Sequence, residues 1–233
     1  MDLLSPEEWT AVHLSLEIAG LATLISLPFA IAAAWVLARC RFPGKAVFDS
    51  FVHLPLVLPP VVTGYILLVL LGRYGVIGSF LLQHFNIVFA FRWTGAAIAC
   101  AVMGFPLMVR AIRLAIEGVD PRLEAAAGTL GANPFLTFAT VTLPLAVPGI
   151  IAGMVLAFAK ALGEFGATIT FVSNIPGETQ TLSAAIYTAL QDPNGDSTVV
   201  RLTMVSILLA IVALIASEAL ARRARIKIGQ AMV

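Results

Sequence analysis

An all-α membrane protein is the fold class that this sequence predicts, with about five transmembrane helices in a single domain over residues 1–233. Hydrophobic residues make up 60% of the chain and charged residues 12%, whereas soluble domains average roughly 45–50% and about 25%. Five apolar runs carry no charge and approach or exceed the ~17–25 residues that a helix needs to cross a membrane. The period-two alternation of a membrane barrel is absent. The runs are Ile18–Ala38, Leu54–Leu71, Trp93–Val109, Phe135–Ala159 and Leu202–Ser217.

Clusters of basic residues set the expected orientation of these spans. They follow the first, the third and the last apolar run, and by the positive-inside rule such regions lie in the cytoplasm. The N-terminus, with Glu7 and Glu8, is then outside and the C-terminus inside, which agrees with five spans. Arg73 and Arg92 on the outer side are exceptions. The clusters are Arg39, Arg41 and Lys45; Arg110, Arg113 and Arg122; and Arg222, Arg223, Arg225 and Lys227.

Helix-breaking residues distinguish the first two spans. The first span is expected to begin near Ala11 and its apolar run holds one proline, whereas the second run holds three prolines and a glycine. Each proline removes a backbone hydrogen bond at membrane depth, which is tolerated inside protein or beside a water-filled path. The second span therefore either lines the pathway or kinks for packing, and both interpretations stay open. Its candidate pathway or gate residues are Pro59, Pro60, Thr63 and Gly64.

Residues 72–92 are expected to form an external loop with a short interfacial segment. The third span follows, and we predict that its helix continues beyond the membrane, because Arg113 and Glu117 are spaced to pair across one helical turn.

The stretch Asp120–Pro148 contains a short helix between two spans. Asp120-Pro121 is typical of a helix start, with an Asp cap and Pro in the first turn. Gly131, Asn133 and Pro134 are typical of its end and of the start of the next helix. The helix between them has one apolar face, which indicates a docking partner. That face consists of Leu123, Ala126, Ala127 and Leu130.

The fourth span combines close-packing residues with charge. Gly149 and Gly153 suit close helix packing. Lys160 and Glu164 lie one turn apart at its outer end, where intramembrane charges mark a pathway or gate. Both side chains could instead reach the outer interface, and we keep both interpretations. Residues 165–190 are expected to form a re-entrant or half-crossing pair of segments, or a sixth span if they cross. The last span is expected to run from about Val199 to Ala221.

Motifs for catalysis and metal binding are missing from the sequence. It contains no GxxxxGK[ST] phosphate loop, no HExxH and no GxSxG. Cys40 and Cys100 lack metal-ligand spacing and an evident disulfide partner. We expect a protein that is not an enzyme, binds no cofactor or metal, and receives energy for any uphill transport from another subunit.

The stretch Asp120–Pro148 resembles the cytoplasmic loop of bacterial ABC-importer permeases. The family pattern is Glu-Ala-Ala, three residues, Gly, nine residues, Ile, one residue and Leu-Pro. Aligned on Gly131, the glutamate of the pattern falls on Ala125, with Glu124 one position earlier. The resemblance implies a coupling loop at about 120–144, whose helix sits in a cleft of a separate ATPase subunit. The other matched positions are Ala126, Ala127, Val141, Leu143 and Pro144.

Three longer stretches extend the resemblance to the molybdate-type permeases, over roughly Leu14 to Ala221. They are LPLVLPPVVTGYILLVLLGRYGVIG, GFPLMVRAIRLAIEGVDP and ALGEFGATITFVSNIPGETQTLSAAIY. The resemblance implies the ABC-importer permease fold in the inner membrane, as a homodimer with two ATPase subunits and a periplasmic or extracellular binding protein. ATP would be used by the ATPase, the cargo would be molybdate or tungstate, and no nucleic acid is involved.

Three alternatives remain at this point. A permease of the same class could carry sulfate or another small anion. A self-contained secondary transporter would move its cargo without an ATPase, and it would require more buried ionisable residues than the spans contain. A structural membrane anchor would leave the proline-rich second span and the docking helix without a role.

Overall fold

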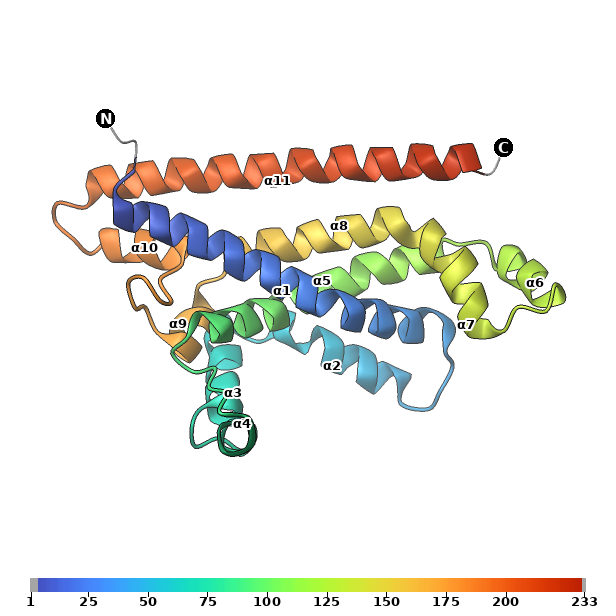
Figure 1. Cartoon of the computed structure of the whole chain (residues 1–233), viewed down its shortest axis with the longest axis horizontal. Helices are drawn as coiled ribbons and strands as arrows, with labels where there is room; N and C mark the ends of the chain where they lie inside the picture. The colour runs from blue at the N-terminus through green and yellow to red at the C-terminus, as the bar shows by residue number, and fades with distance from the viewer. Residues whose placement is uncertain (1–3, 232–233) are drawn as a thin grey trace.

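The computed structural model describes residues 4–231, except the side chains of residues 217, 218 and 220–231, and shows an elongated bundle of helices (Figure 1). No strand occurs among residues 4–231, so the predicted all-α class is confirmed. The helices are α1 (Pro6–Arg39), α2 (Lys45–Val57), α3 (Pro60–Leu71), α4 (Val76–Phe85), α5 (Trp93–Glu117), α6 (Pro121–Thr129), α7 (Pro134–Thr137), the π-helix η1 (Phe138–Thr142), α8 (Leu143–Leu162), α9 (Gly166–Val172), α10 (Leu182–Ala189) and α11 (Asp196–Ala231).

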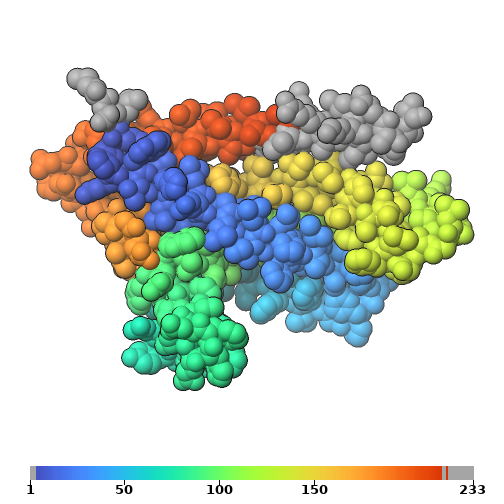
Figure 2. Space-filling model, in the orientation of Figure 1, coloured from blue at the N-terminus to red at the C-terminus, as the bar shows by residue number. Residues whose placement is uncertain are grey.

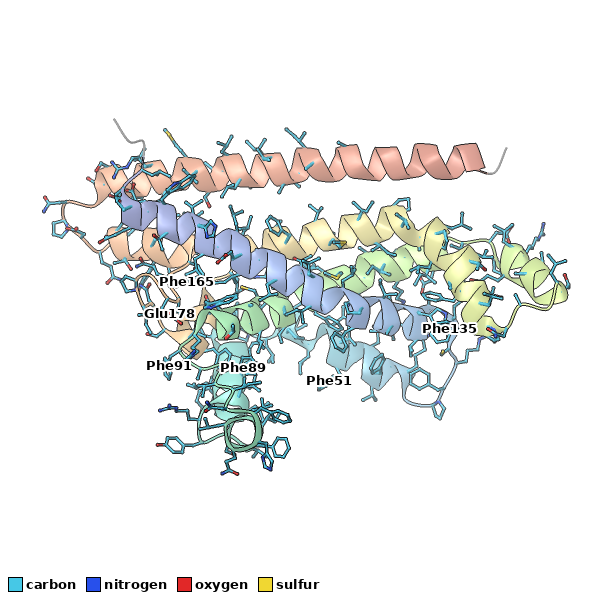
Figure 3. The ribbon with its side chains drawn as sticks, in the orientation of Figure 1. Phe51, Phe89, Phe91, Phe135, Phe165 and Glu178 are labelled. Carbon is cyan, nitrogen blue, oxygen red and sulfur yellow. The ribbon has the colours of Figure 1, made fainter. Side chains whose placement is uncertain are left out.

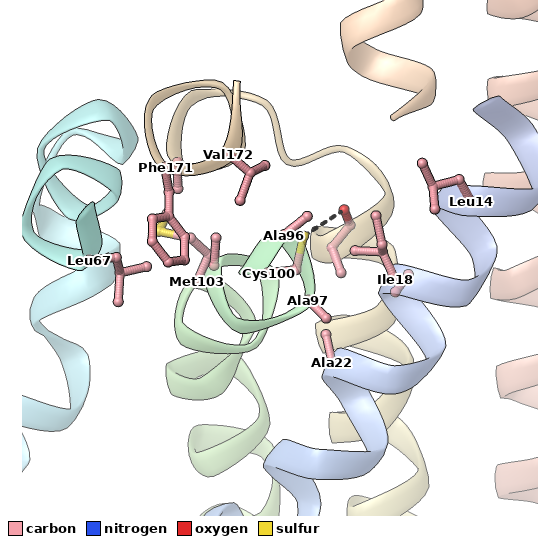
Figure 4. Close-up of a cluster of buried hydrophobic side chains, with 14 of the residues drawn as sticks. Leu14, Ile18, Ala22, Leu67, Ala96, Ala97, Cys100, Met103, Phe171 and Val172 are labelled. Carbon is pink, nitrogen blue, oxygen red and sulfur yellow. Dashed lines mark hydrogen bonds between the residues drawn. The ribbon is translucent and has the colours of Figure 1, made fainter. Parts of the chain in front are cut away.

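The central helix is α5, which packs against both α1 and α8. Several of its side chains at these contacts are small, and in one buried cluster Ala96, Ala97 and Cys100 lie beside Ile18 and Ala22 of α1 (Figure 4). Between helices in a membrane, close packing of small residues replaces the hydrophobic driving force that is available in water. The small residues of α5 therefore determine how closely its neighbours approach.

On α8, two glycines form the surface that packs closely against α5. A Cβ atom added to Gly149 would collide with the Cβ atom of Ala115, and one added to Gly153 would lie 3.1 Å from the carbonyl oxygen of Met108. Both neighbours belong to α5. The predicted packing role of this glycine pair is therefore confirmed.

The second predicted span is broken. α2 and α3 meet at a bend of 111°. α2 ends at Val57 and Leu58 follows it, while Pro59 precedes α3 and Pro60 is its first residue. Two successive prolines cannot donate backbone hydrogen bonds, so the helix stops and restarts in a new direction. The run Leu54–Leu71 is thus not one straight helix, and α3 and α4 project away from the long axis of the bundle (Figure 1).

The count of spans agrees with the prediction of about five. Four helices among the described residues are long and apolar enough to cross a membrane, and the number rises to five where the bent pair α2–α3 is counted as one broken span. α9 and α10, within residues 165–190, have seven and eight residues, too few for a crossing each. α4 lies within the expected external loop, and α5 extends to Glu117 as predicted.

Both terminal helices are longer than expected. α1 begins at Pro6 rather than near Ala11, because Ser5 and Glu8 form a reciprocal capping box. α11 begins at Asp196 and continues to Ala231. The side chains of its basic cluster, Arg222, Arg223, Arg225 and Lys227, lie outside the described residues. At its other end, Arg201 forms a 2.6 Å ion pair with Glu8 and so joins α11 to the start of α1.

We predict that Gly149→Val destabilises the bundle, because the added side chain overlaps Ala115 and forces α5 and α8 apart. Overpacking of this kind costs about 1–3 kcal/mol. Gly20→Val is the matched control, since a Cβ atom at Gly20 meets nothing within 4 Å. Thermal unfolding in detergent measures both variants, and equal losses of melting temperature would contradict the close contact.

Candidate functional site

The expected coupling helix is α6, at one end of the molecule (Figure 2). Asp120 caps it by accepting a hydrogen bond from the Arg122 amide at 2.9 Å. Gly131 follows its end with φ of +87°, a left-handed conformation that favours glycine. Asn133 then caps α7 by accepting from the Leu136 amide at 2.8 Å. The predicted start and end of this helix are therefore confirmed.

The outer face of α6 is uncovered in the single chain. Leu130 is 89% exposed and Leu123 is 44% exposed, while Ala125 and Ala126 are also exposed and Ala127 is half-buried. Phe135, at the start of α7, is 78% exposed at the same end (Figure 3). Apolar side chains gathered at one end of a helical hairpin suit contact with another protein.

Glu124 lies on the covered side of α6. Its Oε1 atom accepts hydrogen bonds from Arg39 Nε at 3.1 Å and from Thr142 Oγ1 at 2.6 Å. Arg39 Nη2 lies 3.0 Å from the same oxygen and also donates to the carbonyl oxygens of Ile116 and Val119, at 2.9 and 3.2 Å. This carboxylate therefore joins α6 to the ends of α1 and α5 and to the last residue of η1.

Sequence reasoning missed this network. It interpreted Arg39 only as part of a basic cluster and assigned no role to Thr142. The two residues lie 85 and 18 positions away from Glu124. The available signal was weak: an acidic residue in the first turn of α6 and an arginine directly after the first apolar run.

The remaining positions of the coupling pattern lie within the π-helix η1 and directly after it. Val141 and Leu143 are half-buried and Pro144 is exposed, whereas Thr142 between them is buried. A π-turn holds one residue more than an α-turn and often occurs at functional sites. Here it forms the connection between α7 and the long helix α8.

The structure brings the pathway candidates of the second span against α9. A Cβ atom added to Gly64 would lie 2.5 Å from the Ala167 carbonyl oxygen, and one added to Gly166 would lie 2.8 Å from Cβ of Pro60. Pro59, at the bend, is exposed. Thr63 is buried, and its hydroxyl has no hydrogen-bond partner among the described residues. Close packing on α9 accounts for Pro60 and Gly64, and a role in the pathway stays a prediction for all four candidates.

Glu164 is buried, so the interpretation that it reaches the outer interface is wrong. Its side chain is 1% exposed and forms a 2.6 Å ion pair with Lys160, which is 30% exposed. Its second oxygen accepts from the Ala167 amide at 2.9 Å. The start of α9 offers unpaired amides to this carboxylate, which compensates part of the cost of burying its charge. The pair thus holds α9 in place beside α3.

Both cysteines are free thiols, and Cys100 is part of a buried apolar cluster. Cys100 is buried and its thiol donates to the Ala161 carbonyl oxygen at 3.6 Å, whereas Cys40 is half-buried. Among the described residues, no three His, Cys, Asp or Glu side chains gather as metal ligands. The lack of a bound cofactor stays a prediction.

We predict that Lys160→Met destabilises the protein by about 3 kcal/mol, because it leaves the Glu164 carboxylate buried without its cation. This value is at the low end of the usual range, since Lys160 is partly exposed. The double variant Lys160→Met with Glu164→Gln should recover most of the loss, because the amide oxygen still accepts from Ala167. Thermal unfolding in detergent measures both, and a double variant as unstable as Lys160→Met would contradict the argument.

Comparison with known proteins identifies a matching family and several similar sequences. Residues 26–226 match the family described as "Binding-protein-dependent transport system inner membrane component". The chain is 61% identical to the molybdenum transport system permease protein ModB of Escherichia coli (strain K12), over 98% of this chain and 100% of that protein. ModB of Haemophilus influenzae is 53% identical, over 97% and 99% of the two chains. The sulfate transport system permease protein CysT of Salmonella typhimurium is 38% identical, over 81% and 68%.

Solved transporters share the fold at low sequence identity. A bacterial alginate ABC transporter, in complex with its alginate-bound periplasmic protein, superposes with a TM-score of 0.74 at 20% identity, over 94% of this chain and 80% of that chain. The MetNI methionine ABC transporter in an inward-facing conformation superposes with a TM-score of 0.69 at 15% identity, over 95% and 96% of the two chains. The expected permease fold is therefore confirmed.

Proposed function

The chain belongs to the family of binding-protein-dependent transport system inner membrane components, and we propose that it is the membrane-spanning permease of an ATP-driven molybdate importer. The observation that carries the proposal is the 61% identity with a molybdenum permease over nearly the whole chain. The spans place it in the inner membrane as a multi-pass protein. The chain is a transport component and not an enzyme. Sulfate as cargo is less well supported, because the sulfate permease is less similar and only 68% of it is covered.

We propose three kinds of partner. An ATPase subunit, which binds and hydrolyses ATP, would dock on the outer face of α6, because this apolar face is uncovered. A substrate-binding protein outside the membrane would deliver the oxyanion, as the related alginate transporter is described in complex with a periplasmic protein. A second copy of this chain would complete the pathway, and the C-terminus and α6 would face the cytoplasm.

We also propose that the pathway itself binds its cargo weakly. A divalent oxyanion that is held tightly needs arginine, lysine or helix N-termini around it. The spans contain few cations, and Arg39, Lys160 and Arg201 are each engaged with a carboxylate. Selectivity would then reside in the delivering protein.

The isolated permease should accordingly bind molybdate with a Kd above about 1 mM. Isothermal titration of the permease in lipid nanodiscs measures this value, with sulfate titrated in parallel. Micromolar, molybdate-selective binding by the isolated permease would contradict a weak pathway.

A charge on the outer face of α6 should uncouple transport. Ala126→Arg should leave the fold intact, because Ala126 is exposed. It should weaken binding of the ATPase by about tenfold or more, because the added cation enters an apolar contact. Gly131→Pro should also uncouple, since proline cannot adopt the positive φ at this position. In both variants we expect normal membrane insertion and reduced molybdate uptake per ATP hydrolysed.

The control is Gln191→Arg, which adds the same charge at another exposed position, far along the chain from α6. Unchanged uptake in both α6 variants would rule out the coupling role. A self-contained secondary transporter, the alternative of another class, requires uptake by this chain in vesicles without any ATPase. Absence of such uptake, with recovery when the ATPase is added, supports the importer.

A further inference from the structure

The two faces of α6 are built for different contacts. Ala125 and Ala126 are exposed, together with Leu123 and Leu130. Glu124 is turned the other way, and its side chain is only 21% exposed. The acidic residue of this helix therefore points into the chain and not toward the surface on which we propose that the ATPase docks.

The contacts of Arg39 explain why the carboxylate is held so firmly. Arg39 is the last residue of α1, and its side chain is 22% exposed. Its planar guanidinium group presents several donors in a rigid arrangement. Nε donates to Glu124, while Nη2 donates to the carbonyl oxygens of Ile116 and Val119 and lies 3.0 Å from the same Glu124 oxygen as an ion pair. The carbonyl oxygens at a helix C-terminus lack partners within the helix, so one arginine completes the end of α5 and binds α6 at once.

Thr142 joins a fourth segment, η1, to the Glu124 carboxylate, in addition to α6, α1 and the end of α5. It is 1% exposed at the end of η1, and its hydroxyl donates to Glu124 Oε1 at 2.6 Å. A hydrogen bond to a charged acceptor is about twice as strong as one between neutral groups. α8 begins at the next residue, so the bond reaches the helix that packs on the centre of the bundle.

We propose that Glu124, Arg39 and Thr142 form an internal anchor that transmits movement of α6 to the ends of α1 and α5 and to the start of α8. The inference rests on the proposed function, in which α6 is the coupling helix. Arg39 and Thr142 are positioning residues: they act through Glu124 and need not touch the ATPase. The acidic group of the coupling helix thus serves contacts within the permease, while Ala125 and Ala126 belong to the docking face.

The alternative is a direct contact between Glu124 and the ATPase. Such a contact would require the carboxylate to leave both Arg39 and Thr142. The two roles predict different behaviour, because an internal anchor depends equally on all three residues, whereas a direct contact depends on Glu124 alone.

The test is a double-mutant cycle in the complete transporter, reconstituted in proteoliposomes with its ATPase and binding protein. The variants are Arg39→Gln, Glu124→Gln, their combination, and Thr142→Val, which keeps the shape of the side chain. Two quantities are measured: molybdate transported per ATP hydrolysed, and the affinity of the permease for the ATPase. Glu117→Gln is the matched control, because it removes a carboxylate that pairs with Arg113 at 2.8 Å near the same end of α5.

Each single variant should lower molybdate transported per ATP by about fivefold or more, a typical size for coupling between sites. Affinity for the ATPase should stay unchanged, and the combined variant should be no worse than the poorer single one, because the residues act as a unit. Loss of ATPase affinity in Glu124→Gln but not in Arg39→Gln would overturn the anchor in favour of a direct contact. Normal transport per ATP in Glu124→Gln and Thr142→Val would overturn it altogether. Failure of the proposed function looks different, since the unmodified transporter would then show no ATP-dependent uptake.

Discussion

Close approach of α5 to its two neighbours is the constraint on which the rest of this structure depends. The contacts on one side use Ala96 and Ala97, and those on the other use Gly149 and Gly153 of α8. Side chains of this size bring helix backbones into direct contact, and in a membrane this packing supplies most of the attraction between helices. The ends of α1, α5 and α8 are thereby brought together at one end of the bundle, where α6 is attached.

The bundle has two polar assemblies with different tasks. Near the bend of the second span, the ion pair of the partly exposed Lys160 with the buried Glu164 fixes the short helix α9, which packs on α3. At the coupling end, Glu124 gathers three other segments around one carboxylate. In both assemblies the charge of a carboxylate is matched by a cation and by a second hydrogen-bond donor. The second donor binds the other oxygen in Glu164 and the same oxygen in Glu124. Each therefore defines a relative position of helices that apolar packing alone leaves free to slide.

Much of the candidate site follows from local patterns. Asp120, Gly131 and Asn133 each act within a few residues of themselves, so their capping roles are visible in the sequence. The burial of Glu164 is not local, because it depends on the packing of α9 against α3. For this reason the sequence left open both a pathway role and a side chain at the interface, where the structure has an ion pair with a buried Glu164.

Sequence alone determined four of the spans, the ends of α6 and the start of α7, the packing glycines and the short helix between two spans. These features depend on composition, on periodicity and on hydrogen bonds between near neighbours, all of which are written in consecutive residues. The tertiary structure alone decided the 111° bend between α2 and α3 and the partners of Glu124. Two prolines predict that a helix is interrupted, but its new direction depends on what α3 packs against. Likewise, Arg39 contacts Glu124 because α1 and α5 end side by side. A local sequence pattern cannot predict this contact, because the two residues are 85 positions apart.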